Sequence, residues 1–115
     1  MSKVYLMQEP LPKSDGWTPD LSSAADHGAI KAIFDKGDRV YIDTDAAVEK
    51  ARLRLKDFDP KEDFLLWVGF ADPSVQWLVP MVLVDMGFKE INYLFWSKRP
   101  SSANGGYYYP IKIKL

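Results

Sequence analysis

The chain of 115 residues contains no cysteine, and its one histidine is His27. Without thiolates, neither a disulfide scaffold nor a thiolate zinc site can form, and a cytosolic setting fits this composition. Long hydrophobic runs are also missing. The most apolar run, Val75 to Val84, is far shorter than the ~20 residues that span a bilayer, and the apolar stretch near Met1 is too short for a signal peptide. We therefore expect a protein that is neither secreted nor membrane-spanning.

An excess of charge of one sign is missing as well, because the formal net charge is −1. Such a balance gives no global field that favours nucleic acid. The distribution is uneven, however. Residues 89–115 carry five cations and one anion, a net of +4, which leaves −5 for the remainder. The C-terminal part is therefore the expected anion-facing surface.

The content of apolar and aromatic residues, 47% and 14%, is that of a globular protein. A length of 115 residues is typical of one domain, so we predict a single α/β domain over residues 1–115. Apolar runs at Lys3–Gln8 and Ala29–Phe34 predict strands. A short helical turn should lie before Gly28, and Arg39–Ile42 favours a further short extended piece.

The second half of the sequence shows the stronger patterns. A helix is predicted from the cap at Asp43 to Phe58, followed by a central strand, Phe64–Gly69. A second helix, Ser74–Met86, is apolar almost all round, contains Pro80 and should end at Gly87. Burial of its large apolar side chains should outweigh the cost of that proline, ~3 kcal/mol.

Ile91–Trp96 and the alternating segment Tyr107–Leu115 predict a C-terminal antiparallel hairpin. Strand–helix–strand order around Gly69 predicts a parallel crossover. The fold class that follows is α/β: a small three-layer or two-layer sheet with a parallel strand–helix–strand core, two main helices and the C-terminal hairpin.

Several short motifs follow one another along most of the chain. They are Lys3-Val4-Tyr5 with Glu9-Pro10, Asp20 to Ala24 with Gly28, Leu55 to Phe58, Val68-Gly69 with Asp72-Pro73, Leu94-Phe95-Trp96, and Tyr109-Pro110-Ile111. Their order resembles a family of small tailed-bacteriophage proteins of unknown activity. This resemblance implies a phage accessory protein and supplies no activity.

The loop from Gly69 to Ser74 is the first candidate site. It joins the carboxyl end of a predicted parallel strand to a helix N-terminus, where α/β sheets bind ligands and free N–H groups meet anions. Gly69, Asp72 and Ser74 are the candidate ligand-binding residues. The alternative is that Asp72 and Pro73 only cap the helix.

The C-terminal hairpin is the second candidate site. Cations interleaved with an exposed aromatic side chain can grip phosphates and stack a base. The alternative is an ordinary solvated strand face whose lysines discourage edge-to-edge pairing. The candidate nucleic-acid residues are Lys98, Arg99, Tyr108, Lys112 and Lys114.

Two further groups of side chains have simpler interpretations than a site. His27 lies near Ser22, Ser23 and Asp26, but residues so close in sequence rarely adopt nucleophile–base geometry, so a helix-end role is favoured. The acidic residues Asp57, Asp59, Glu62 and Asp63 could hold Mg²⁺, yet a solvated linker is the preferred interpretation. We predict no catalytic residue, no metal site and no cofactor.

The hypothesis favoured by the sequence is a non-catalytic phage accessory factor in the host cytoplasm. It would bind a host or phage protein, or pair with itself as a homodimer. It rests on the resemblance and on the absence of catalytic groups. If the apolar helix is not covered on both sides, it leaves an apolar patch, and such patches mark partners. The alternative is that this helix and the four Trp residues simply fill a small core. Two alternatives stay open: a nucleotide or small-molecule binder or enzyme using Gly69–Ser74, and nucleic-acid binding through the hairpin.

Overall fold

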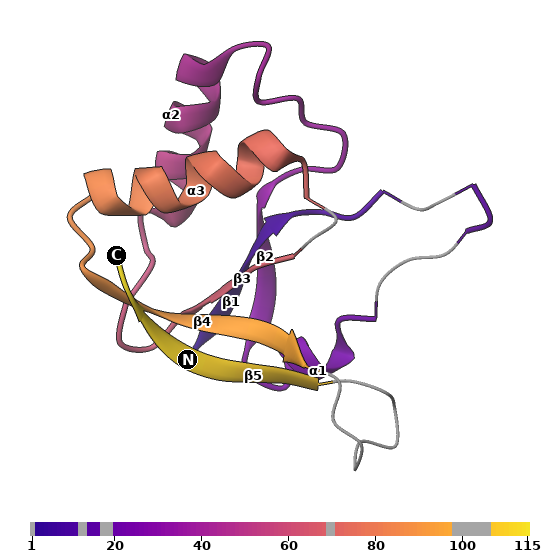
Figure 1. Ribbon diagram of the computed structural model, residues 1–115, viewed down its shortest axis with the longest axis vertical. Helices are drawn as coiled ribbons and strands as arrows, with labels where there is room; N and C mark the ends of the chain where they lie inside the picture. Colours follow the sequence, from indigo (N-terminus) through magenta and orange to yellow (C-terminus); the bar gives the residue numbers. More distant parts are fainter. Residues whose placement is uncertain (1, 12–13, 17–19, 69–70, 98–106) are drawn as a thin grey trace.

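The computed structural model describes residues 2–11, 14–16, 20–68, 71–97 and 107–115 (Figure 1). Within them, five strands form one sheet in the order β2-β1-β3-β4-β5. Three helices accompany the sheet. The bounds are β1 (Lys3–Gln8), α1 (Ser22–Ala25), β2 (Ala29–Phe34), α2 (Thr44–Leu55), β3 (Phe64–Leu66), α3 (Pro73–Asp85), β4 (Glu90–Ser97) and β5 (Tyr107–Lys114).

Parallel pairing makes up most of the sheet. β1 pairs in parallel with both β2 and β3, and β3 pairs in parallel with β4. β4 and β5 pair antiparallel. The predicted parallel core and C-terminal antiparallel pair are thus confirmed, and β3 is the central strand of the five. It ends at Leu66, and Gly69 lies outside the described residues.

The helices lie on both faces of the sheet. Tyr5 packs edge-on against Phe58, just after α2, with ring centroids 5.2 Å apart. Phe64, which pairs with Val4, packs against His27, just after α1. Successive residues of a strand point to opposite faces and register partners to the same face, so α1 and α2 cover opposite faces. Figure 1 shows α3 beside α2, which makes three layers.

Local sequence signals mark the start of α2 and the end of α3. Asp43 accepts a hydrogen bond from Ala46 N at the start of α2, and Ala47, Ala51 and Leu55 then face the core. After α3, Gly87 takes a positive φ of 94°. Gly87 N donates to Val84 O and Phe88 N to Leu83 O. These two bonds form a Schellman motif, which satisfies the last carbonyls of the helix.

The prediction of a short extended segment at Arg39–Ile42 is wrong. This segment is a turn in which Ile42 N donates to Arg39 O over 3.2 Å. Its β-branched and aromatic residues are typical of a strand, but it pairs with no strand in the described part of the chain. Only Val40 is buried, whereas Tyr41 and Ile42 are exposed.

Candidate functional site

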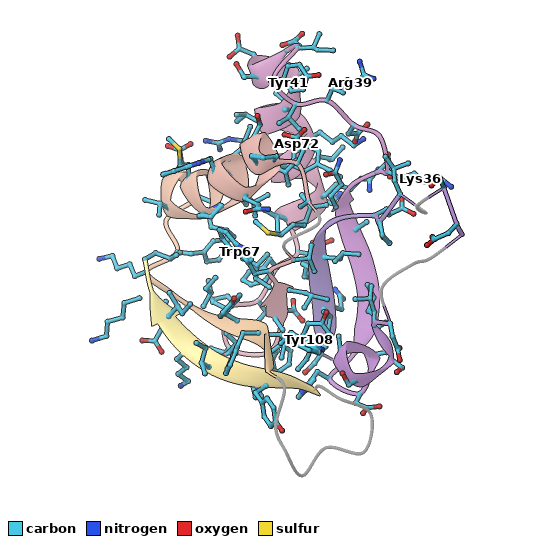
Figure 2. All side chains as sticks on the ribbon, turned by 45° about the vertical axis from the view of Figure 1, so that its right-hand side comes forward. Lys36, Arg39, Tyr41, Trp67, Asp72 and Tyr108 are labelled. Atoms are coloured by element: carbon cyan, nitrogen blue, oxygen red, sulfur yellow. The ribbon has the colours of Figure 1, made fainter. Side chains whose placement is uncertain are left out.

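The carboxyl ends of β1 and β3 form the switch point of this sheet. The chain passes from β1 to β2 on one side, and then from β2 to β3 on the other side of β1. Open α/β sheets bind ligands outside such a point. Figure 2 shows Asp72 at the same end of the molecule as Lys36, Arg39 and Tyr41 of the β2–α2 loop, with Tyr108 at the opposite end.

Gln8 fills the centre of this switch point. Its side chain is buried, with 6% of its surface exposed. The amide nitrogen donates to Asp38 O at 3.1 Å and lies 3.3 Å from Asp35 O, while the amide oxygen accepts from Asp72 N at 2.9 Å. One side chain therefore joins the end of β1 to the β2–α2 loop and to the β3–α3 loop. The sequence feature that indicates this role is a polar residue, Gln8, at the end of an apolar strand.

The N-terminus of α3 is capped by its own sequence. Asp72 Oδ1 accepts from Ser74 N at 2.8 Å, and Pro73 at the first turn has no N–H to offer. Gln76 Nε2 donates to Ala71 O at 3.0 Å and so fixes the preceding loop. A phosphate at Ser74 would have to displace the Asp72 carboxylate, while Gly69, the third candidate, lies outside the described residues. Ligand binding by these residues stays a prediction.

A charged cluster lies beside Gln8. Lys50 Nζ is 2.8 Å from Asp35 Oδ2 and 2.6 Å from Asp38 Oδ2. The hydrogen bond from Lys50 lowers the pKa of the Asp35 carboxyl, and the bonds to Asp35 and Asp38 raise the pKa of Lys50. All three side chains are partly exposed, so the cluster acts chiefly to hold the β2–α2 loop against α2.

α3 leaves one face uncovered. Val75, Val79, Val82 and Leu83 are buried on its inner face. On the outer face, the exposed fractions of Trp77, Met81 and Val84 are 76%, 66% and 54%. Their spacing of i, i+4 and i+7 places them in one row along the helix. We call this row the α3 stripe; it contains no charged residue.

The hairpin candidates do not form one surface. Lys112 and Lys114 pair with Asn92 and Glu90 at the start of β4, whereas Tyr108 pairs with Trp96 near its end. At ~3.4 Å per residue, Tyr108 and Lys114 are about 20 Å apart along β5. Lys98 and Arg99 lie outside the described residues.

The predicted exposure of Tyr108 is wrong. Only 6% of its surface is exposed, and burial raises the pKa of its phenol. The cause is α1, which contacts β5 at this point and brings His27 Nε2 to 3.1 Å from Tyr108 O. Local alternation along β5 could not reveal a helix that is more than eighty positions earlier in the chain.

Asp63, expected in a solvated linker, is a buried anchor. Its exposed fraction is 2%, and it accepts hydrogen bonds from Lys3 N and Asp59 N at 2.9 and 2.8 Å. It thereby joins β1 to the α2–β3 loop. Among the residues that the structure describes, no group of three or more acidic or histidine side chains is placed to hold a metal ion. The described helices include none with the length and apolar character needed to cross a membrane.

The comparison with known protein families gives a match over almost the whole chain. Residues 2–115 match the family model described as "Phage Pam3 gp32-like protein". No curated protein and no solved structure matches the chain. The match covers the sheet, the described helices and both candidate sites.

Proposed function

The chain belongs to the Phage Pam3 gp32-like protein family, and from this premise we propose that it is a non-catalytic, protein-binding phage factor. Its place of action would be the host cytoplasm, and its partner a host or phage protein. The α3 stripe carries this proposal. Trp77, the most exposed of the three stripe residues, is 76% exposed.

The stripe has the properties of a helix-docking surface. Apolar side chains at i, i+4 and i+7 are the anchors by which helices engage apolar grooves. Tryptophan is enriched among residues that dominate binding energy, because it buries a large area at little entropic cost. An apolar row in water marks an interaction site, whereas single exposed apolar side chains need no explanation.

The stripe is also separable from the core. The buried residues of α3 are a different set, on the opposite face of the helix. Substitution of exposed side chains away from special features normally changes stability by no more than about 0.5 kcal/mol. A variant lacking the stripe should therefore fold normally and lose its partner, which separates binding from stability.

The test uses a photo-crosslinking amino acid, p-benzoylphenylalanine, in place of Trp77 in phage-infected host cells. A second protein carries it in place of Lys31, an exposed residue of β2. We expect one discrete crosslinked species from position 77 and none from position 31. Mass spectrometry identifies the partner, and a crosslink to a second copy of the chain would identify a homodimer.

A matched pair of variants completes the test. Trp77→Ser with Met81→Ser should abolish capture of the crosslinked partner by tagged protein, with the melting temperature little changed. Leu53→Ser, which removes a 62% exposed leucine of α2, should leave capture intact. If the unmodified chain, the double variant and Leu53→Ser all capture the partner equally, the stripe is not the binding surface.

A further inference from the structure

A basic cleft lies at the amino end of β4, far along β5 from Tyr108. It has a volume of about 470 Å³, within the range of ligand pockets. The cleft is formed by the α2–β3 loop, the turn after α3, and the paired strands β4 and β5. Its lining includes Lys61, Phe88, Lys89, Glu90, Asn92 and Lys112. We call it the lysine cleft.

The fold brings these lysines together from three separate segments. Asn92 on β4 directs its side-chain nitrogen at Pro60 O, 3.4 Å away, which holds the loop containing Lys61 beside the sheet. Lys112 is the register partner of Asn92, so both side chains point to the same face. Lys114 follows on that face of β5, two residues further on.

The charge of the cleft differs in sign from that of the chain. Three lysines and one glutamate among the lining residues give a net of +2. The chain as a whole is −1. Lys112 Nζ lies 3.8 Å from Glu90 Oε1, and both side chains are exposed, so this pair adds little stability. In the described part of the chain, Lys61 and Lys89 form no ion pair, which leaves their ammonium groups facing solvent.

We propose that the lysine cleft binds the phosphodiester backbone of single-stranded nucleic acid. Ammonium groups are point charges suited to phosphate oxygens. The half-buried Phe88 lines the same cleft. Cations combined with an aromatic surface in one groove are the arrangement by which proteins hold single strands without reading sequence. This proposal is independent of protein binding through the α3 stripe.

The test measures binding of a fluorescent oligo(dT) by anisotropy as salt is raised. Three lysine–phosphate contacts on a single strand, one for each lysine that lines the cleft, predict a slope of log K against log salt of about −2.1, from about −0.7 per contact. Binding should therefore weaken roughly 20-fold between 50 and 200 mM salt. In the double variant Lys61→Gln with Lys89→Gln, the slope should change to about −0.7, at an affinity well below that of the unmodified chain.

Two control variants show whether the loss of affinity belongs to the lysine cleft. Lys31→Gln with Lys36→Gln removes the same charge from exposed positions on β2 and the following turn and should leave affinity within about twofold. Trp77→Ser with Met81→Ser should also leave it unchanged, which keeps this test independent of the α3 stripe. A circular dichroism spectrum confirms that each variant is folded.

The proposal is overturned by no oligo(dT) binding at 50 mM salt, by equal losses in both pairs of lysine variants, or by equal affinity for a duplex of the same length. Competition by tripolyphosphate and by dTMP identifies the source of the phosphate. If dTMP binds as tightly as the oligonucleotide, the cleft holds a free phosphate compound and nucleic acid is excluded as its ligand. If affinity rises with oligonucleotide length, the nucleic-acid backbone is the ligand.

Discussion

Gln8 illustrates how one buried polar side chain fixes the end of a sheet. Both of its amide atoms are hydrogen-bonded to backbone groups of two loops that the sequence places far apart. We expect Gln8→Leu to lower the free energy of unfolding by about 2–4 kcal/mol, because Asp72 N and Asp38 O lose a buried partner. Urea unfolding measures the loss, and Lys31→Leu, an exposed change on β2, is the control. A loss below 1 kcal/mol would show that water replaces the amide at no cost.

The Lys50 cluster gives a pH dependence whose direction is set by the pKa of Asp35. The hydrogen bond from Lys50 lowers this pKa in the folded protein. A lowered carboxyl pKa contributes stability above the unfolded value, near 3.9, and this contribution is lost as pH falls through the folded value. Lys50→Met should therefore raise the pKa of Asp35 toward its ordinary value and weaken the dependence of the urea midpoint on pH between 6 and 3. An NMR titration that observes the Asp35 carboxyl carbon measures this pKa. Identical titration curves in the unmodified chain and in Lys50→Met would contradict the prediction.

At the scale of elements, α3 begins with a cap that the sequence alone indicates. Asp72 accepts from Ser74 N, so Asp72→Ala should cost about 1 kcal/mol of unfolding free energy. Asp72→Ser keeps an oxygen acceptor in the same place and should recover most of it. Urea unfolding of the two variants compares them. Equal stability of Asp72→Ala and the unmodified chain would mean that the bond from Asp72 N to Gln8 holds the loop without the cap.

The ends of helices could be predicted from the sequence where the interactions that set them are local. The caps at Asp43 and Asp72 and the stop at Gly87 act within a few residues of their helices, so spacing and residue type identified them. Parallel pairing of β3 with β4 followed from the helix between them. The order of the strands in the sheet could not be predicted from the sequence. No local pattern shows whether β1 pairs with β2 alone or with both β2 and β3.

At the scale of the whole molecule, the errors at Asp63 and Tyr108 share a cause. Asp63 looked solvated and Tyr108 looked exposed, but each meets a partner far away in sequence: Lys3 in one case and His27 in the other. Likewise, the lysine cleft joins Lys61 to Lys112 across about half the chain. Burial and charge clustering depend on how the segments meet in space, which periodicity along one segment does not specify.

The outer edge of β5 is also contacted by a residue from a distant segment, His27. Along an antiparallel strand, residues alternately direct their backbone groups toward the partner strand and away from it. Leu115 N donates to Lys89 O, and this bond sets which residues of β5 face β4. Residues 108, 110, 112 and 114 therefore turn their backbone groups away from β4, toward the open edge. There His27 Nε2 lies against Tyr108 O, Pro110 has no N–H, and the lysines bring charge. Natural sheets protect their edges against pairing by such means.

Removing two of these protections should therefore convert β5 into a pairing edge. Pro110→Val restores a backbone donor, and His27→Ala exposes Tyr108 O. We expect the double variant to self-associate increasingly as its concentration is raised. Pro110→Val alone should associate more weakly, because His27 still covers Tyr108 O. Sedimentation equilibrium measures the association constant of each. Lys31→Val, which adds the same apolar side chain to the edge strand β2 without altering a backbone donor, is the control. If all three variants associate equally, surface hydrophobicity and not the open edge of β5 drives the assembly.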